Sequence, residues 1–406
     1  MPAVKTGKIA ANHGRRVRLV KMKYWKTLCG AGFLLVLISN VWSISGWTEI
    51  RGVYDDLCYL RQAHLFQRFG IDGLNTDISR DDDQYFAEKL KQVGFPTWRE
   101  PKTYPCHTPM PETNKRVLQY PPGTGFALAL FPAGFQVIPL YVLASVVAFV
   151  VALAALRRAS SLFALLLVAA FGDTAIYLMI NPTKASYSMA PTMMVCALAG
   201  FLTAKLFGST AQQRLPLTIL IGLLLGVAVN FRLPNLFLSS GYFLFFFGSF
   251  LLSRNRGTLV QGVFFGAAFL VGMVPTLLAN AINAGGALST TYGDVDVKPP
   301  ELSSDVIWRY LADMQFVLLV LAGAWTALTL RLNPESGARR VAVVAAGNLM
   351  VNVAFFMSHP VFTPYYTIPI SMLSLWSLLF ASLKQPAAVQ NKPMAQVATA
   401  SLVRHV

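Results

Sequence analysis

Long apolar segments recur through most of this chain, and they constrain its fold more than any other feature. A helix needs roughly 20 mostly apolar residues to cross a bilayer. Windows of this kind recur from Thr27 to Leu383, too many for a single signal peptide or anchor. We place about ten spans on them, at residues 27–45, 137–156, 160–180, 188–206, 216–231, 234–252, 260–280, 314–331, 340–357 and 365–383. The sequence therefore predicts an all-α polytopic membrane protein.

The charged residues support this fold and indicate its topology. Only 13% of the residues are charged, whereas about a quarter are charged in soluble domains. Basic residues flank alternate loops, in which Glu335 is the one acid, while the other loops hold nearly all Asp and Glu. The positive-inside rule then places both termini in the cytoplasm. The net charge of +16 thus reflects topology, and we expect membrane lipids but no nucleic acid as partners.

This topology divides the chain into three parts. Residues 1–26 form a basic cytoplasmic arm, 27–383 the transmembrane domain, and 384–406 a cytoplasmic tail that we predict to be disordered. Two long extracytoplasmic loops interrupt the transmembrane domain, at 46–136 and 281–313. Short cytoplasmic loops are typical of bacteria, so we expect a multi-pass protein of the bacterial inner membrane.

The first loop is predicted to carry short helices along the membrane surface. Residues 56–69 have apolar side chains at helical spacing, with Arg61 and Gln62 on the other side. A second helix is expected at 80–93, and residues 126–135 are predicted to form an interfacial or re-entrant element. Between them, the five prolines from Pro96 to Pro111 are expected to break any regular structure. Cys58 and Cys106 both lie in this loop, where a disulfide could persist, but their spacing leaves the pairing open.

Adjacent carboxylates at Asp55 and Asp56 are the sharpest local feature, about ten residues beyond the first span. Such a pair can act as a general base or hold a cation. Asp56 can equally be explained as a cap of the following helix.

The order of several motifs resembles the polyprenyl-phosphate-dependent glycosyltransferases of the GT-C fold, such as protein mannosyltransferases, aminoarabinose transferases and galacturonosyltransferases. In that superfamily an acidic pair follows the first span, then a Tyr and an Ala along a surface helix, then a Tyr-Pro-Pro element. The corresponding elements here are Asp55-Asp56, Tyr59, Ala63 and Tyr120-Pro121-Pro122, followed later by Arg157-Arg158, Gly222 to Gly226 with Arg232, the Asn283, Gly285 and Tyr292 loop, and His359-Pro360 with Tyr365-Tyr366. The chain departs from the pattern in having Asp-Asp instead of Asp-Glu and no acid near the start of the fourth span.

The resemblance implies an inverting sugar transfer on the extracytoplasmic face. The donor would be a polyprenyl-phosphate sugar, and the acceptor an envelope glycan, lipid or protein. Asp55 or Asp56 would be the catalytic base, with Arg232, Lys115 and Arg116 as candidate contacts of the donor phosphate. Further candidates for substrate binding are Tyr59, Tyr120, Asp173, Tyr292, His359, Tyr365 and Tyr366. We assign no metal ligands and no definite cofactor, although a divalent cation is left open.

Two other functions fit the sequence. A secondary transporter would have about as many spans, and Asp173 within the third span could couple to an ion. Such transporters usually have two matching halves, and none is recognisable here. A catalytically silent GT-C-like scaffold in envelope assembly would keep the fold without depending on Asp55 and Asp56.

Overall fold

The chain is built almost entirely of helices. The computed structural model describes residues 5–49, 54–179, 186–293, 299–332, 337–359 and 361–383. The elements are α1 (Lys5–Ser45), α2 (Tyr54–Phe69), the 3-10 helices η1 (Gly70–Leu74) and η2 (Ile78–Arg80), α3 (Tyr85–Gln92), η3 (Pro101–Thr103), β1 (His107–Met110), β2 (Lys115–Leu118), α4 (Gly123–Ala129), α5 (Val137–Arg158), α6 (Leu162–Leu178), α7 (Met189–Leu206), α8 (Ala211–Phe231), η4 (Leu233–Ser239), α9 (Ser240–Ser253), α10 (Arg256–Ala284), α11 (Ser304–Ala312), α12 (Phe316–Leu332), α13 (Gly337–Ser358), η5 (Pro364–Tyr366) and α14 (Thr367–Ser382).

Several of these helices are long and apolar enough to cross a membrane. Seven described helices meet this criterion, and an eighth span results if α11 and α12, bent by 83°, are taken as one. The predicted spans fall on α1, α5, α6, α7, α8, η4 with α9, α10, α12, α13 and α14. These spans support the polytopic all-α class. The count of ten stays a prediction, because α6 and α14 are shorter apolar helices of 17 and 16 residues.

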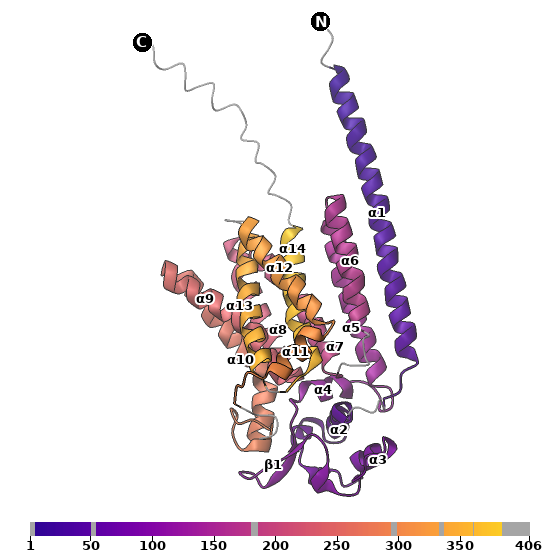
Figure 1. Ribbon diagram of the computed structural model, residues 1–406, viewed down its shortest axis with the longest axis vertical. Helices are drawn as coiled ribbons and strands as arrows, with labels where there is room; N and C mark the ends of the chain where they lie inside the picture. Colours follow the sequence, from indigo (N-terminus) through magenta and orange to yellow (C-terminus); the bar gives the residue numbers. More distant parts are fainter. Residues whose placement is uncertain are drawn as a thin grey trace.

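The centre of the bundle is formed by α14, whereas α1 lies at its edge (Figure 1). Every residue of α14 from 367 to 381 is buried, and the helix packs against α7, α12 and α13. In contrast, α1 packs only against α5 and α6 among the main helix pairs, and exposes Leu34, Leu35, Ile38 and Trp42. Exposed apolar side chains on the flanks of a helical bundle are expected where lipid is the solvent.

Helices α8 and α10 approach each other closely through glycines. A Cβ at Gly222 would lie 2.5 Å from the Phe265 carbonyl oxygen, and one at Gly226 would clash with that of Phe269. At the end of this contact the Asn230 side chain donates to Gly272 O at 2.7 Å and accepts from Thr276 N at 2.9 Å. Small residues thus bring the backbones together, and a buried amide fixes the end of α8.

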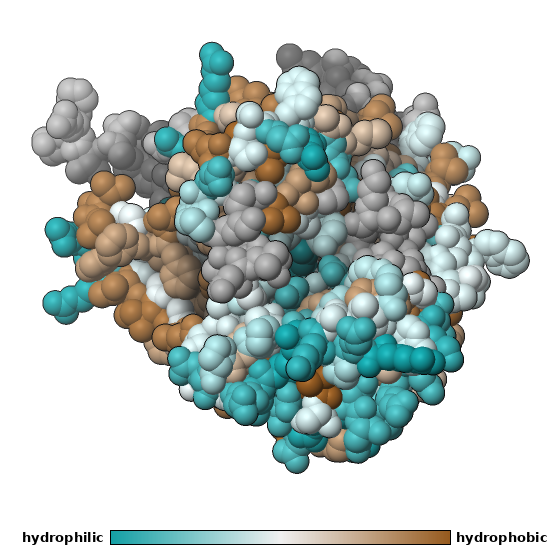
Figure 2. Space-filling view, turned by 60° about the horizontal axis from the view of Figure 1, so that its bottom comes forward, coloured by the Kyte–Doolittle hydropathy of each residue, from teal (hydrophilic) through white to brown (hydrophobic). Residues whose placement is uncertain are grey.

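The segment from α2 to α4 forms a layer at one end of the bundle, here called the loop end. The start of α1 and the end of α14 lie at the opposite end (Figure 1), where basic residues also finish α5, α7 and α12. Viewed toward the loop end, the molecule presents a hydrophilic face with apolar side chains on its flanks (Figure 2). The basic ends of α5, α7 and α12 therefore lie away from the hydrophilic loop end, while the orientation of the bundle in the membrane stays a prediction.

The structure corrects three expectations for this layer. Arg61 and Gln62 of α2 are not on a solvent-facing side, because the layer covers them and leaves them 0% and 1% exposed. The second helix begins at Tyr85, because residues 81–83 precede it as a turn. The proline-rich stretch, expected to be irregular, contains the antiparallel hairpin of β1 and β2, in which His107 pairs with Leu118 and Met110 with Lys115.

A disulfide joins α2 to this hairpin. Cys58 and Cys106 are bonded, and their Cα atoms lie 6.5 Å apart. The pairing that the sequence left open is therefore present, and it connects the first turns of α2 to the segment that leads into β1. The other two cysteines, Cys29 and Cys196, are free thiols.

Candidate functional site

A pocket lined by charged, aromatic and apolar side chains lies where the loop end meets the helical bundle. Its volume is about 520 Å³, and its walls come from α2, the segment before α4, the end of α8 with η4, the end of α13 and η5. Eight of the predicted site residues line it: Asp55, Tyr59, Tyr120, Arg232, Tyr292, His359, Tyr365 and Tyr366. Residues as far apart in the sequence as Asp55 and Tyr366 therefore share one cavity.

Asp55 lies on one wall, held by a tyrosine from another segment. The Tyr120 O–H donates a 2.7 Å hydrogen bond to Asp55 Oδ1. The Tyr59 ring, one turn further along α2, stacks on Tyr120 with ring centroids 4.9 Å apart. Burial and the neighbouring Asp55 raise the pKa of Tyr120 well above its usual value, so its phenol stays protonated and donates this bond.

The two adjacent carboxylates face different surroundings. Asp56 is 2% exposed, lies outside the pocket lining, and accepts a 3.0 Å hydrogen bond from the backbone N–H of Tyr187. Because α2 already begins at Tyr54, Asp56 lies within its first turn and connects α2 to the segment before α7. Asp55 is therefore the carboxylate that faces the cavity, and Asp56 is placed for a structural role.

Arg232 brings a buried positive charge into the same pocket. It follows the last residue of α8 and is 8% exposed. Its guanidinium carbon lies 4.4 Å from the Tyr365 ring centroid and 5.0 Å from that of Tyr366, while Nη1 lies 3.3 Å from Met189 Sδ. Among the described residues no carboxylate comes within 4.0 Å of it. A buried cation without a paired anion favours binding of an anionic ligand.

Aromatic side chains form much of the remaining wall. His359, at the end of α13, stacks on Phe355 with ring centroids 5.3 Å apart. Tyr292 meets the edge of Tyr120 at 6.1 Å. The tyrosines of the pocket combine a hydrogen-bonding hydroxyl with a broad apolar face, which suits a polyhydroxylated ligand.

Three further predicted residues lie elsewhere. Lys115 Nζ donates to Ile282 O at 2.7 Å, and Arg116 Nη1 to His107 O at 3.3 Å, so both cations support the hairpin. Asp173 lies within α6, and its Oδ1 is buried without a hydrogen-bond partner in the described part of the chain. None of the three lines the pocket, which leaves Arg232 as the predicted phosphate contact located there.

Several residues of the pocket were not predicted from the sequence. Gln119, Ser186, Phe237, Phe355 and Thr363 also line it. Gln119 directly precedes Tyr120-Pro121-Pro122, so its position beside that motif was a signal. The others carry no local pattern that distinguishes them from ordinary residues of helix ends.

The three acidic residues at 81–83 form ion pairs with side chains of α2 within the loop end. His64 Nε2 lies 2.7 Å from Asp83 Oδ2, and Arg68 Nη1 lies 2.7 Å from Asp82 Oδ1. Arg61, whose Nη atoms donate to the carbonyl oxygens of residues 76 and 77 at 2.9 Å, also lies 3.8 Å from Asp81. Within the described ranges, no three His, Cys, Asp or Glu side chains form a group suited to a metal ion.

A carboxylate and a guanidinium facing one cavity can deprotonate a hydroxyl and stabilise an anion at the same time. Neither protein-family models nor curated proteins give a match for this chain.

Proposed function

We propose that this chain is an integral-membrane glycosyltransferase that moves a sugar from a polyprenyl-phosphate donor to an envelope glycan, lipid or protein. The single observation that carries the proposal is that Asp55 and Arg232 line the same pocket, at one end of a bundle of apolar helices. The order of motifs that resembles the GT-C superfamily supports it, since eight of its residues converge on that pocket.

The location of the pocket suits a lipid-linked donor. Arg232 lies between η4 and the end of α8, which is one of the helices long enough to cross the membrane. A span end lies at headgroup level, where a polyprenyl chain in the bilayer would present its phosphate. Basic residues end α5, α7 and α12 at the opposite end of the bundle, and under the positive-inside rule this supports an extracytoplasmic pocket.

The proposed reaction is a single inverting displacement. Asp55 takes the proton of an acceptor hydroxyl, and the hydroxyl oxygen attacks the anomeric carbon of the sugar. The bond between that carbon and the phosphate oxygen breaks, and its electron pair leaves with polyprenyl phosphate. Arg232 stabilises the negative charge of the phosphate as it leaves. Tyr120 positions the Asp55 carboxylate through its 2.7 Å hydrogen bond.

The test is sugar transfer by the purified full-length protein. A panel of radiolabelled polyprenyl-phosphate monosaccharides would be offered with membrane-extracted acceptors, with and without a chelator. We expect wild-type turnover of at least one donor and a loss of about a hundredfold or more in Asp55→Asn. Matched controls are Asp305→Asn and Arg309→Ala, which break an exposed 3.0 Å ion pair on α11 outside the pocket.

The sugar-transfer assay and an uptake assay in proteoliposomes together separate the alternatives. Full activity in Asp55→Asn would remove the proposed base. No turnover of any donor by wild-type protein, together with substrate uptake that Asp173→Asn abolishes in proteoliposomes, would favour a transporter. The transporter is considered because Asp173 Oδ1 is buried within α6 and has no hydrogen-bond partner among the described residues.

A further inference from the structure

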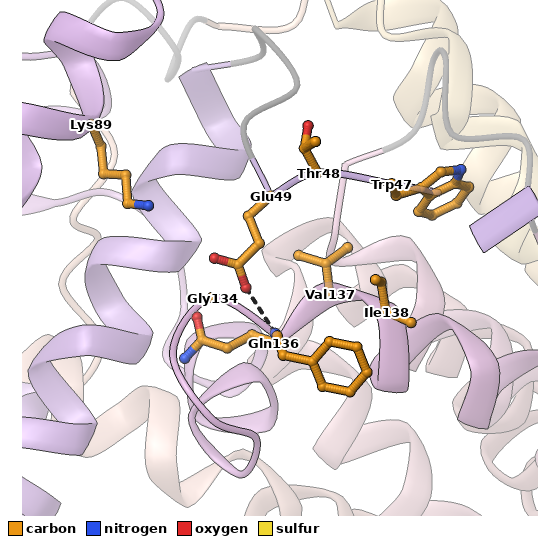
Figure 3. Close-up of a pocket in the computed structure, with 9 residues that line it drawn as sticks. Trp47, Thr48, Glu49, Lys89, Gly134, Gln136, Val137 and Ile138 are labelled. Atoms are coloured by element: carbon orange, nitrogen blue, oxygen red, sulfur yellow. Dashed lines mark hydrogen bonds between the residues drawn. The ribbon is translucent and has the colours of Figure 1, made fainter. Parts of the chain in front are cut away.

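A second pocket lies beside the first span, apart from the residues that line the candidate site. Its volume is about 350 Å³, and it is lined by residues of the segment after α1, of α3, and of the start of α5 with the residues just before it. Figure 3 shows Glu49 and Gln136 on one side of this pocket and Lys89 reaching toward it from α3 on the other. None of its lining residues belongs to the pocket of Asp55 and Arg232.

Opposite charges face this second pocket without neutralising each other. Neither Lys89 nor Glu49 has an ion-pair partner within 4.0 Å in the described part of the chain. Glu49 Oε1 accepts a 2.7 Å hydrogen bond from the backbone N–H of Gln136, which fixes the carboxylate and leaves its charge uncompensated. The Lys89 ammonium lies 5.6 Å from the Tyr85 ring centroid. The pocket therefore offers one cationic and one anionic group to a ligand.

Apolar side chains at the ends of two spans form another part of the lining. Trp47 follows α1, and Phe135, Val137 and Ile138 lie at the start of α5. The Phe135 side chain is 51% exposed, and Trp47 packs edge-on against Tyr141 at 5.1 Å. Since α1 and α5 both qualify as membrane spans and α1 packs on α5, their adjoining ends lie at the level of lipid headgroups.

We propose that this pocket binds the headgroup of a zwitterionic phospholipid that carries a primary amine. The lipid phosphate contacts the Lys89 ammonium, the lipid ammonium contacts the Glu49 carboxylate, and the first methylenes of the acyl chains lie along Phe135 and Ile138. A purely anionic headgroup would meet the fixed carboxylate of Glu49. A trimethylated amine lacks the N–H donors that Glu49 can accept from. This proposed lipid site does not depend on the proposal that the protein transfers a sugar.

Lipid retention by the purified full-length protein in detergent tests this proposal. Native mass spectrometry would measure binding of dioleoylphosphatidylethanolamine, dioleoylphosphatidylcholine and dioleoylphosphatidylglycerol at equal concentrations. We expect phosphatidylethanolamine to bind about tenfold more tightly than the other two lipids, as one charge-assisted hydrogen bond allows. Equal binding of the three lipids by the wild-type protein would overturn the proposal without any variant.

Two variants assign the contacts. Glu49→Gln keeps an acceptor for the Gln136 N–H and should abolish the preference for phosphatidylethanolamine over phosphatidylglycerol. Lys89→Gln should weaken binding of all three lipids. The controls are Glu88→Gln and Lys91→Gln, on the same helix but outside the pocket lining. Unchanged lipid selectivity in Glu49→Gln, in protein with a wild-type unfolding midpoint, would contradict the assignment.

Discussion

Tyr120 donates a 2.7 Å hydrogen bond to Asp55 from a position 65 residues further along the chain. This bond links the Tyr-Pro-Pro segment to the first turn of α2 and so determines how the carboxylate faces the pocket. Glycines let the two segments approach, since a Cβ at Gly125 would lie 2.5 Å from Gln62 Cγ. The position of Asp55 therefore depends on packing between α4 and α2 as well as on its own helix.

Tyr120→Phe should lower kcat for sugar transfer by about tenfold while leaving KM for the donor nearly unchanged. The ring still stacks on Tyr59, but the carboxylate loses its donor and samples unproductive orientations. Steady-state kinetics on the purified protein measure this split. Tyr104→Phe, which removes a 2.9 Å phenol bond to Trp98 O in the same layer, is the control. Equal kcat losses in the two variants would point to a general effect on stability.

Asp55 and Asp56 should respond differently to substitution. Asp56→Ala leaves the buried Tyr187 N–H without its acceptor and should destabilise the protein by about 1–3 kcal/mol. Asp55→Ala should change stability far less, because the side chain is only partly buried and faces the cavity. Thermal unfolding in detergent provides the comparison. The assignment is wrong if Asp55→Ala proves the more destabilising of the two.

Arg232→Lys should behave much more like Arg232→Ala than like wild type. A lysine keeps the charge but loses the planar group that stacks on Tyr365 and Tyr366 and can bind a phosphate through two hydrogen bonds. We expect KM for the polyprenyl-phosphate donor to rise about tenfold or more in both variants. Lys115→Ala, which removes a cation located outside the pocket, should leave KM unchanged. Wild-type KM in Arg232→Lys would show that charge alone suffices.

The helical bundle could be predicted from the sequence, because long apolar segments are a local pattern that determines where its helices lie. The length of the apolar segments alone located the helices of the bundle. In lipid, the backbone N–H and C=O groups of a spanning segment must hydrogen-bond within the protein, and a helix achieves this within one segment. The hairpin of β1 and β2 was missed because its strands have four residues each and lie among prolines. The burial of Arg61 was missed for a different reason. Its partners at residues 76, 77 and 81 only become neighbours when the loop folds back over α2.

The sequence identified residues that meet in one pocket, but it did not distinguish the surroundings of each residue. The ordered motifs identified eight residues that converge, whereas the sequence could not separate Asp55 from Asp56. Their difference depends on the backbone of Tyr187, more than a hundred residues away. Lys115 and Arg116 were second candidates after Arg232, because they are cationic and lie just before the Tyr-Pro-Pro motif. Strand pairing instead directs them toward carbonyl oxygens at residues 282 and 107.

The disulfide should contribute substantially to the stability of the loop end. Cys58 and Cys106 are separated by 48 residues, and closing such a loop restricts the unfolded chain. The double substitution of both by Ser should lower the free energy of unfolding by about 2–4 kcal/mol. Cys29→Ser is the control, since it removes a free thiol. An unchanged unfolding midpoint in the double variant would show that contacts around α2 hold the layer without the bond.

His107 should make the protein less stable as the pH falls below about 6.5. The side chain is buried, Nδ1 donates to the Pro105 carbonyl oxygen at 2.7 Å, and Nε2 has no partner among the described residues. Burial, reinforced by the nearby Arg61 and Arg116 guanidiniums, lowers the pKa of His107 well below 6.5. The imidazole is therefore neutral in the folded protein, while the unfolded chain takes up a proton near pH 6.5.

The direction of this change in the free energy of unfolding depends on whether the folded or the unfolded state binds the proton. Below pH 6.5 the unfolded state binds more protons, so the free energy of unfolding decreases by up to about 1.4 kcal/mol per pH unit until the folded pKa is reached. Burial raises the pKa of nearby Asp81, an effect of opposite sign that acts near the range where carboxyl groups titrate. Unfolding midpoints from pH 8 to pH 5 should therefore decline in wild-type protein and stay flatter in His107→Gln. Parallel pH profiles in the two proteins would mean that another group controls acid stability.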